Sequence, residues 1–243
     1  MIEANVDLAS MIIISLARKG TRLEENDILV IGQKALSKAE GRIVELADVL
    51  PSRLAKNISR KTRRKAEFVD LVLRDSRHVA RAGRDALIVT TKQGFTCLNA
   101  GVDKSNVAGD ETYALLPSDP DRSARNLRSR ILKLTHKKIG VIVCDTNSRP
   151  FRRGQVEQAI GIAGFNAMVD YRGQKDLFGY ELKFKNVAIA DELASAAELV
   201  MGQGTEMTPA AIIRGVGRVK FQERSTISDL TVSRREDLFR GTL

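Results

Sequence analysis

A carboxylate, a hydroxyl and several arginines follow one apolar run near the middle of the chain. Asp145 and Thr146 come directly after VIVC, and Arg149, Arg152 and Arg153 lie in the polar stretch behind them. Mg²⁺ and Mn²⁺ prefer one or two carboxylates with hydroxyls, water and substrate phosphates as ligands. Planar guanidinium groups suit phosphate or carboxylate. The pattern predicts a site where a divalent cation meets an anionic substrate, and a surface loop with self-paired charges is the less favoured interpretation.

A second carboxylate follows another strand-like run. Asp103 and Asn106 lie in the polar segment NAGVDKSN, with Gly101 beside them. A carboxylate at such a place can reach a hard cation, and an asparagine can donate to a phosphate or a sugar. The alternative is an Asx-turn, in which Asp103 only satisfies local backbone amides. Taken alone, this segment favours the turn.

The segment SKAEGR follows the apolar run ILVIG and is rich in cations. Ser37, Lys38 and Arg42 could bind phosphates there, and Gly41 would allow a close backbone approach. The start of a basic helix is an equally good interpretation of the same residues.

Several familiar catalytic patterns are absent from the sequence. It contains no GxxxxGK[ST] phosphate loop, no GxGxxG after a strand, no GxSxG and no HExxH. His78 and His136 lie in stretches of helical character beside basic residues, so a paired catalytic or metal role for them is disfavoured. Cys97 and Cys144 each sit in an apolar run without a CxxC pair, which predicts buried thiols in a reducing, cytoplasmic setting.

The net charge of +10 predicts anionic partners. Nucleic acid is one candidate, because residues 51–78 form a strongly basic stretch expected to be helical. Aromatic residues make up only 5% of the chain and tryptophan is absent, so a stacking surface for single strands is poorly supplied. Small phosphorylated or carboxylated metabolites are therefore the favoured partners, and we expect no nucleic-acid partner. No apolar run approaches the roughly 20 residues that a membrane span needs.

The elements that must position these residues alternate irregularly. A helix capped by Asp7 should present Leu8, Met11, Ile12 and Leu16 on one face, and ILVIG should form a buried strand. The pattern predicts an α+β (mixed α/β) fold, with mixed sheets and packed helices, and not a clean doubly wound sheet.

Later elements are expected from similar signals. Two strands should flank a turn at 93–94, and Ser123 should cap a helix with Leu127, Ile131 and Leu134 on one face. KIGVIVCDT and PAAIIRG predict further strands, and an alanine-rich helix should end near Met201.

An ordered set of short motifs now makes the chain recognisable. LSKAEGR, LNAGVDKSN, LLPSDPD, IVCDTNSRPFRRG, AIGIAG, DLFGYEL, ADELASAAELVMGQG and IIRG occur in that order. Together they resemble the coenzyme F-420:L-glutamate ligase family, over about residues 6–220. Each motif is short, but the ordered set is highly specific.

The resemblance implies a reaction and its cofactors. L-glutamate would be joined to coenzyme F-420-0, a deazaflavin carrier whose phospholactate end bears a carboxylate. GTP would be cleaved, through an acyl phosphate, and a second glutamate could follow through a γ-linkage. The resemblance also implies two Mg²⁺ or Mn²⁺ ions and K⁺. It further implies an intertwined homodimer, in which residues 1–243 of each chain form one catalytic unit that could consist of two subdomains. A differently specific or non-catalytic relative, using another acid, another amine or ATP, is the alternative.

The resemblance also assigns roles by position. Metal ligands would be Asp103, Asp145, Thr146 and Gln203. Nucleotide contacts would come from Gln33, Lys34, Lys38, Asn106 and the stretch Met201, Gly202, Gln203, Gly204, Thr205, Glu206, Met207 and Thr208. Catalysis would rest on Asp145, with Arg152 or Arg153 neutralising charge.

Three departures from the family pattern stand out. Relatives begin with a further strand and a loop that touches the nucleotide, which this chain lacks unless its start is misassigned. Some relatives have Ser-Thr in place of Gln33-Lys34, so Lys34 would offset phosphate charge instead. Some have Glu in place of Gln203, and a neutral amide binds a hard cation more weakly, so we expect a looser second metal here.

Overall fold

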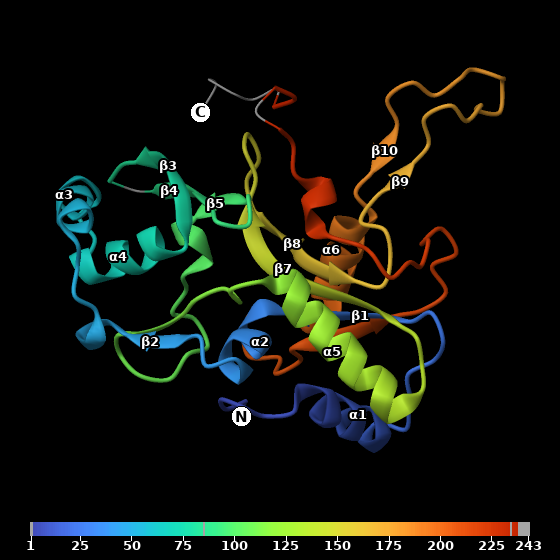
Figure 1. The fold of residues 1–243 in the computed structure, drawn as a ribbon, viewed down its shortest axis with the longest axis horizontal. Helices are drawn as coiled ribbons and strands as arrows, with labels where there is room; N and C mark the ends of the chain where they lie inside the picture. The colour runs from blue at the N-terminus through green and yellow to red at the C-terminus, as the bar shows by residue number, and fades with distance from the viewer. Residues whose placement is uncertain (1, 85, 234, 238–243) are drawn as a thin grey trace.

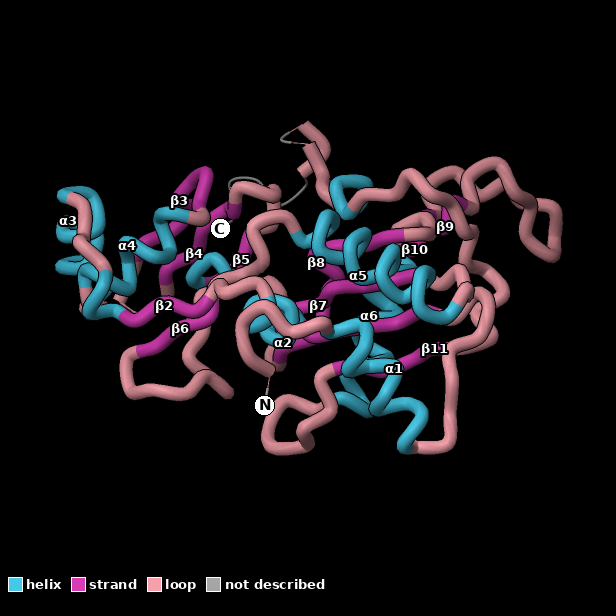
Figure 2. Tube along the Cα trace, turned by 60° about the horizontal axis from the view of Figure 1, so that its bottom comes forward, coloured by secondary structure: helices cyan, strands magenta, loops and turns pink. Residues whose placement is uncertain are grey.

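A four-stranded mixed sheet forms the centre of the molecule (Figures 1 and 2). The computed structural model describes residues 2–84, 86–233 and 235–237. The strand order is β11-β1-β7-β8, formed by β1 (Ile28–Gly32), β7 (Gly140–Ser148), β8 (Gln155–Ala163) and β11 (Ala210–Ile213). β1 and β7 run parallel and the other two pairs are antiparallel. Mixed sheet and packed helices confirm the predicted α+β class.

Both faces of this sheet are covered by helices, because its strands are apolar on both sides. Alternate residues Leu29, Val141 and Val143 pack with α1 (Leu8–Arg18) and α5 (Pro120–Thr135) in one core. Ile28, Val30 and Ile142 point the other way and pack on α6 (Ile189–Met201). Gly161 allows α5 to approach β8 closely, since a Cβ there would lie 2.4 Å from the Pro120 carbonyl carbon. The glycine in β8 therefore allows the first turn of α5 to pack directly on this strand.

Helix ends agree only partly with the sequence prediction. Asp7 caps α1 as expected, since its side chain accepts from the Ser10 amide. α5 is capped by Asp119 and begins at Pro120, so the prediction of Ser123 as its cap is wrong. Proline at the first helical position needs no amide partner, and this lengthens the helix by one turn. Met11 and Leu134, each expected to share a face with the apolar residues of its helix, are 40% and 41% exposed and lie at the edge of that face.

Residues 43–115, which we call the inserted segment, lie between α2 (Gln33–Ala39) and α5. Its core is a separate apolar cluster, in which Val69, Leu71 and Val89 are fully buried. In chain order its elements are β2 (Ile43–Glu45), η1 (Leu46–Asp48), α3 (Arg53–Thr62), α4 (Ala66–Arg74), β3 (Ser76–Ala82), β4 (Leu87–Thr91), β5 (Thr96–Leu98), η2 (Asn99–Gly101) and β6 (Thr112–Ala114). The two strands flanking residues 93–94 confirm that prediction.

The basic stretch 51–78 is not one helix. α3 ends where Arg63 adopts a left-handed conformation, with φ at 54°, and α4 begins three residues later. The Ser59 hydroxyl donates to the Arg64 carbonyl and closes this turn. His78 lies in strand β3, so its predicted helical setting is also wrong. The break turns α4 so that Phe68 and Val69 enter the core.

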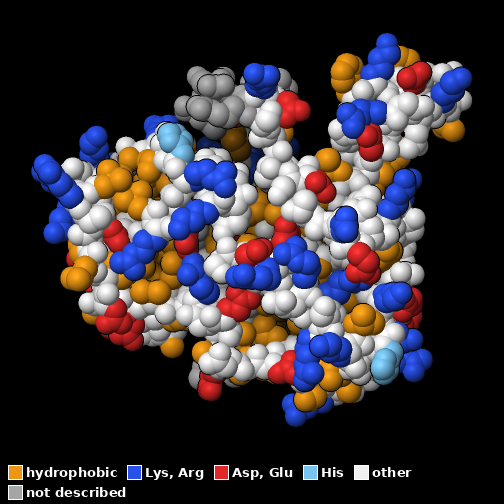
Figure 3. Space-filling model, viewed as in Figure 1, with side chains coloured by type: hydrophobic (Ala, Val, Ile, Leu, Met, Phe, Trp, Pro, Cys, Tyr) orange, Lys and Arg blue, Asp and Glu red, His pale blue; other side chains and the backbone are white. Residues whose placement is uncertain are grey.

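An arm projects from the sheet side of the molecule. Residues 169–187 leave through β9 (Val169–Asp170) and return through β10 (Asn186–Val187) (Figure 1). Leu177, Phe178 and Phe184 are almost fully exposed on it, and hydrophobic atoms are visible on the arm in Figure 3. The chain then continues through α6 and β11 to η3 (Ile227–Leu230). Within the described residues, no helix is long and apolar enough to span a membrane.

Candidate functional site

The parallel pairing of β1 and β7 brings two of the predicted segments together. Gly32 at the end of β1 is aligned with Cys144 in β7, so Gln33-Lys34 and Asp145-Thr146 follow at neighbouring positions. β7 continues to Ser148, so the strand does not end with the apolar run VIVC and Asp145 lies inside it. The carboxyl end of β1 still opens beside it, which is where mixed sheets place ligands.

The inserted segment contributes the second aspartate. Lys34 Nζ lies 2.5 Å from Asp103 Oδ2, and Lys38 Nζ donates to the Asn106 carbonyl at 2.6 Å. Residues 37–39 form the last turn of helix α2 and residues 40–42 follow it outside the helix, so the segment is partly helix and partly loop and does not start a helix. The partly buried Lys34 and Lys38 therefore reach from α2 to the loop that carries Asp103.

Asp103 forms the Asx-turn that its segment favoured, and it also pairs with Lys34. Its carboxylate accepts from the Ser105 amide at 3.0 Å and from the Ser105 hydroxyl at 2.6 Å, which forms the Asx-turn. Burial alone would raise the pKa of Asp103, but the hydrogen bonds from Lys34 and Ser105 outweigh it and hold that pKa below its usual value. The carboxylate therefore stays ionised and is held between Lys34 and Ser105.

A polar cluster lies next to Asp145 on the paired strands β7 and β8. The Thr146 hydroxyl is 2.8 Å from Glu157 Oε2 and 2.9 Å from Gln203 Oε1. Gln203 Nε2 donates to the same Glu157 oxygen at 3.2 Å. Thr146 and Glu157 are register partners, so this contact is built into the sheet. The cluster fixes the two predicted neutral metal ligands beside one buried carboxylate.

Asp145 is the most perturbed carboxylate of this region. Burial, together with the charges of Glu157 and Asp103, raises its pKa to about 7, even though Lys34 and the Thr146 amide act to lower it. The ionised group thus has one nearby cation against two nearby carboxylates. The ionised form of this carboxyl group would be stabilised by a further positive charge placed next to it.

Replacing Asp145 by asparagine should stabilise the ligand-free protein. Its raised pKa means that the folded chain holds the proton more tightly than the unfolded chain between the ordinary value of 3.8 and about 7. Stability is therefore lost as pH rises through that window, and the ionised form remains costly above it. We expect a gain of roughly 2–4 kcal/mol at about pH 8 that shrinks towards about pH 5. Urea unfolding of both proteins at the two pH values measures it, and a gain independent of pH would contradict it.

The loop after α6 closes one side of the region. Gly204 links it to the inserted segment, since its carbonyl accepts from Asn106 Nδ2 at 3.4 Å. The Gly204 amide donates to Glu206 Oε2 at 2.7 Å, and the Thr208 hydroxyl donates to the Glu206 carbonyl. The residues placed in this loop by the resemblance are Gly202, Gln203, Gly204, Thr205, Glu206, Met207 and Thr208, mostly exposed, whereas Met201 is buried on the last turn of α6.

Gln33 occupies the boundary between the strand end and helix α2. It is 2% exposed, and its Oε1 accepts from the Ser37 hydroxyl at 2.8 Å. Its buried Nε2 has no hydrogen-bond partner among the residues that the structure describes. A buried donor of this kind fits an anionic or carbonyl oxygen of a ligand.

The predicted arginines lie farther away. Arg152 and Arg153 are exposed in the turn between β7 and β8, beyond Ser148. At about 3.3 Å per strand residue, this turn starts roughly 10 Å along the strand from Asp145. Arg149 has a buried Nε without a partner in the described part of the chain. The structure therefore does not place these guanidinium groups against the central carboxylates.

Sequence reasoning missed two residues of the site. Glu157 is 4% exposed and contacts both Thr146 and Gln203, and Ser105 contacts Asp103. A glutamate inside the apolar strand QVEQAIGIA is a detectable signal, because a buried carboxylate needs a partner. Both cysteines are free and buried as predicted, and burial raises the pKa of Cys97 to about 12.

The oxygen atoms of the site suit a hard cation, but they do not by themselves complete its coordination sphere. Carboxylate, hydroxyl and amide oxygens meet here, and these are the ligands that Mg²⁺ and Mn²⁺ accept. Within residues 2–84, 86–233 and 235–237, no three His, Cys, Asp or Glu side chains lie close enough together to hold a metal ion. A cation here would need ligand oxygens from a substrate, as Mg²⁺ usually does at phosphate sites.

Comparison with known proteins agrees with the family resemblance that the motifs indicated. The sequence profile described as F420-0:Gamma-glutamyl ligase matches residues 1–215. The chain belongs to this family. A Coenzyme F420:L-glutamate ligase of Archaeoglobus fulgidus is 42% identical over 243 residues, covering 100% of this chain and 94% of the relative. Proteins of the same name from Methanothermobacter thermautotrophicus and Methanopyrus kandleri are 40% and 46% identical, over 99% and 86% of this chain and 95% and 81% of their own lengths. The resemblance inferred from the ordered motifs is confirmed.

Proposed function

We propose that this F420-0:gamma-glutamyl ligase family member forms an amide bond between L-glutamate and coenzyme F-420-0, with cleavage of GTP. One observation supports this above the others. Two aspartates more than forty positions apart, Asp103 and Asp145, converge on Lys34 at the end of a central strand. The names of the relatives, which refer to F420 and L-glutamate, supply the substrates.

The proposed reaction solves a leaving-group problem in two steps. A carboxylate oxygen of F-420-0 attacks the γ-phosphorus of GTP, the bond to the β-phosphate oxygen breaks, and GDP leaves. The acyl phosphate is then attacked at its carbonyl carbon by the glutamate amine. The amine loses a proton, the C–O bond breaks, and inorganic phosphate leaves. Such phosphoryl transfer demands positioning and charge neutralisation more than covalent help from protein groups.

The residues of the site suit these demands. Lys34 and Lys38 would offset the phosphate charge, and the buried Nε2 of Gln33 would donate to a ligand oxygen. In this proposal Asp103, Asp145, Thr146 and Gln203 would hold Mg²⁺ or Mn²⁺, which when bound neutralises charge on the phosphates. Arg152 and Arg153 are proposed to attract anionic substrates from the turn where they lie exposed. A K⁺ requirement is also proposed, on family resemblance.

Incubation with F-420-0, L-glutamate, GTP and Mn²⁺ tests the proposal directly. Mass spectrometry should show one or two added glutamyl units, together with GDP and phosphate. Parallel reactions with ATP in place of GTP, and with other acidic amino acids in place of glutamate, distinguish a relative of different specificity. Nucleotide cleavage with no new amide bond in any reaction would contradict the proposal.

We also propose that the protein works as a homodimer, because the arm at residues 169–187 is poorly suited to solvent. Phe178 is 95% exposed at its far end, with Leu177 and Phe184 exposed on the same arm. Exposed aromatic groups of this kind are typical of protein contacts. Light scattering should give a mass twice that of the 26.8 kDa chain. The Phe178→Asp variant should shift the measured mass towards that of the monomer. Lys183→Asp, an exposed change on the same arm, controls for charge, and a monomeric wild type would refute the dimer.

A further inference from the structure

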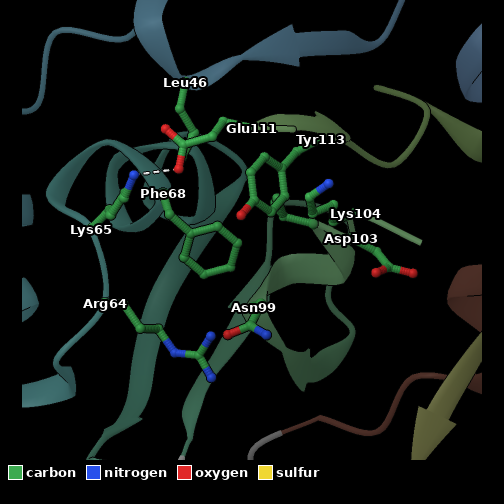
Figure 4. A pocket seen from close by; sticks show the side chains of 10 residues that line it. Leu46, Arg64, Lys65, Phe68, Asn99, Asp103, Lys104, Glu111 and Tyr113 are labelled. Atoms are coloured by element: carbon green, nitrogen blue, oxygen red, sulfur yellow. Dashed lines mark hydrogen bonds and ion pairs between the residues drawn. The ribbon is translucent and has the colours of Figure 1, made fainter. Parts of the chain in front are cut away.

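A pocket of about 370 Å³ opens beside Asp103 in the inserted segment. Figure 4 shows it from close by, with residues from η1, the α3–α4 turn, α4, η2 and β6 around it. Asp103 lies at one side, and its carboxylate points away from the aromatic rings of the pocket (Figure 4). The pocket is therefore adjacent to the reaction centre described above and uses different residues for most of its wall.

Two buried polar atoms in this wall have unmet hydrogen-bonding capacity. Arg64 Nε, a donor, and Asn99 Oδ1, an acceptor, are both buried, and neither has a partner among the described residues. Their side chains lie next to each other on the same side of the pocket (Figure 4). Leaving such groups unpaired costs on the order of 1–3 kcal/mol each, so their presence indicates a ligand that satisfies both.

The rest of the wall is aromatic and apolar. The rings of Phe68 and Tyr113 lie 5.3 Å apart at an angle of 56°, and the Arg64 guanidinium stands 5.4 Å from the centre of the Phe68 ring. Leu46 and Val102 complete the apolar surface. A planar ring could pack on such a surface while its edge meets a donor and an acceptor side by side.

A simple anion is a poor occupant of this pocket. A phosphate or carboxylate would satisfy Arg64 but would face the carbonyl oxygen of Asn99 and the Glu111 carboxylate. The other two cations of the wall already have partners: Lys65 is ion-paired with Glu111, and Lys104 donates to the Gly109 carbonyl at 3.0 Å. The unpaired donor and acceptor together call for a neutral group with its own acceptor and donor in adjacent positions.

We propose that this pocket binds the deazaflavin ring of F-420-0, an inference that rests on the proposed function. The pyrimidinedione edge of such a ring carries an N–H between two carbonyls. The N–H would donate to Asn99 Oδ1, and a neighbouring carbonyl would accept from Arg64 Nε. The ring would pack against Phe68 and Tyr113, and its flexible polyol-phosphate tail would lead the carboxylate past Asp103 to the site of phosphoryl transfer.

Guanine has a similar edge, so the experiment must separate the two rings. The probe, called the riboside below, is the deazaflavin with its open polyol chain but without the phospholactate, so it cannot be ligated. Its fluorescence is titrated with wild type, Arg64→Ala, Arg64→Lys and Asn99→Gly, with GDP as a competitor. Glycine is chosen at Asn99 because φ there is 54°, which glycine adopts without strain. Lys61→Ala, an exposed change on α3, is the matched control for lost charge.

We expect each pocket variant to weaken riboside binding about tenfold, with Lys61→Ala unchanged and no competition from GDP. The analogue methylated at the ring N–H should bind wild type about tenfold more weakly, and Asn99→Gly should not distinguish it from the riboside. Thermal unfolding of each variant identifies any that fails to fold, and Arg64→Lys keeps the charge while removing the Nε donor. Equal binding by folded variants, displacement by GDP, or no binding to wild type would overturn the inference.

These outcomes are separable from failure of the proposed function. Riboside binding requires no GTP, metal or glutamate, so it reports on the ring pocket alone. If the wild type ligates glutamate to F-420-0 while the pocket variants bind the riboside normally, the ring site is wrong and the reaction stands. If the riboside binds as expected but no amide forms, the reaction is wrong and the ring site stands.

Discussion

Replacing Asp145 by asparagine is expected to lower the rate of glutamate ligation by about 100-fold or more. The substitution keeps the shape of the side chain but removes the negative charge that a hard cation requires. Loss of groups that merely orient metal ligands costs about 10–100-fold, so loss of a ligand carboxylate should cost at least as much. Initial rates of glutamyl-F-420 formation at saturating GTP and Mn²⁺ measure it.

The same variant should be more stable than the wild type, so lost activity cannot be ascribed to unfolding. The opposing signs follow from one cause, since the partly buried Asp145 has the carboxylates of Glu157 and Asp103 nearby and only Lys34 as a neighbouring cation. Glu192→Gln, an exposed change on α6, is the matched control and should be neutral in both measurements. Wild-type rates in Asp145→Asn would remove this residue from the reaction centre.

Glu157→Gln should lower kcat/KM by about 10–100-fold and raise the Mn²⁺ concentration needed for half-maximal rate. Glu157 accepts hydrogen bonds at Oε2 from Gln203 and lies within hydrogen-bond distance of Thr146, so it orients both. An amide at this position can no longer accept from both partners with a full negative charge. The variant should also bring the pKa of Asp145 down, because the charge of Glu157 is a main cause of its elevation.

A Mn²⁺ titration separates this positioning role from a purely structural one. If Glu157 acts through Thr146 and Gln203, high Mn²⁺ should restore part of the lost rate, and the pH dependence of stability should shrink. A variant that loses activity without any change in metal dependence or pH profile would show that Glu157 only supports the fold.

The fold class and the central strands could be predicted because their signals are local. ILVIG and VIVC are apolar on both faces, which is the pattern of strands covered by helices on two sides. The break between α3 and α4 could not be predicted, since Arg63 adopts its left-handed conformation without a glycine or proline to signal it. Tertiary packing of Phe68 and Val69 decides that turn, and no local pattern encodes it.

Some residues of the candidate site could be predicted from the sequence and others could not. Asp103 and Asp145 were selected because each carboxylate follows an apolar run, and the structure brings both near Lys34. Glu157 was missed because its partners Thr146 and Gln203 become neighbours only through strand pairing and the return of the chain after α6. The arginines were grouped with Asp145 by sequence distance, but an extended strand carries them away from it.

The division of labour between the sheet and the inserted segment has an evolutionary consequence. The central strands supply Asp145 and Thr146, whereas the ring pocket with Asn99 and Phe68 belongs wholly to residues 43–115. Substitutions that enlarge or reshape that pocket leave the strand pairing of β1, β7 and β8 untouched. A descendant lineage could therefore bind a new acid while the strand residues Asp145 and Thr146 stay in place.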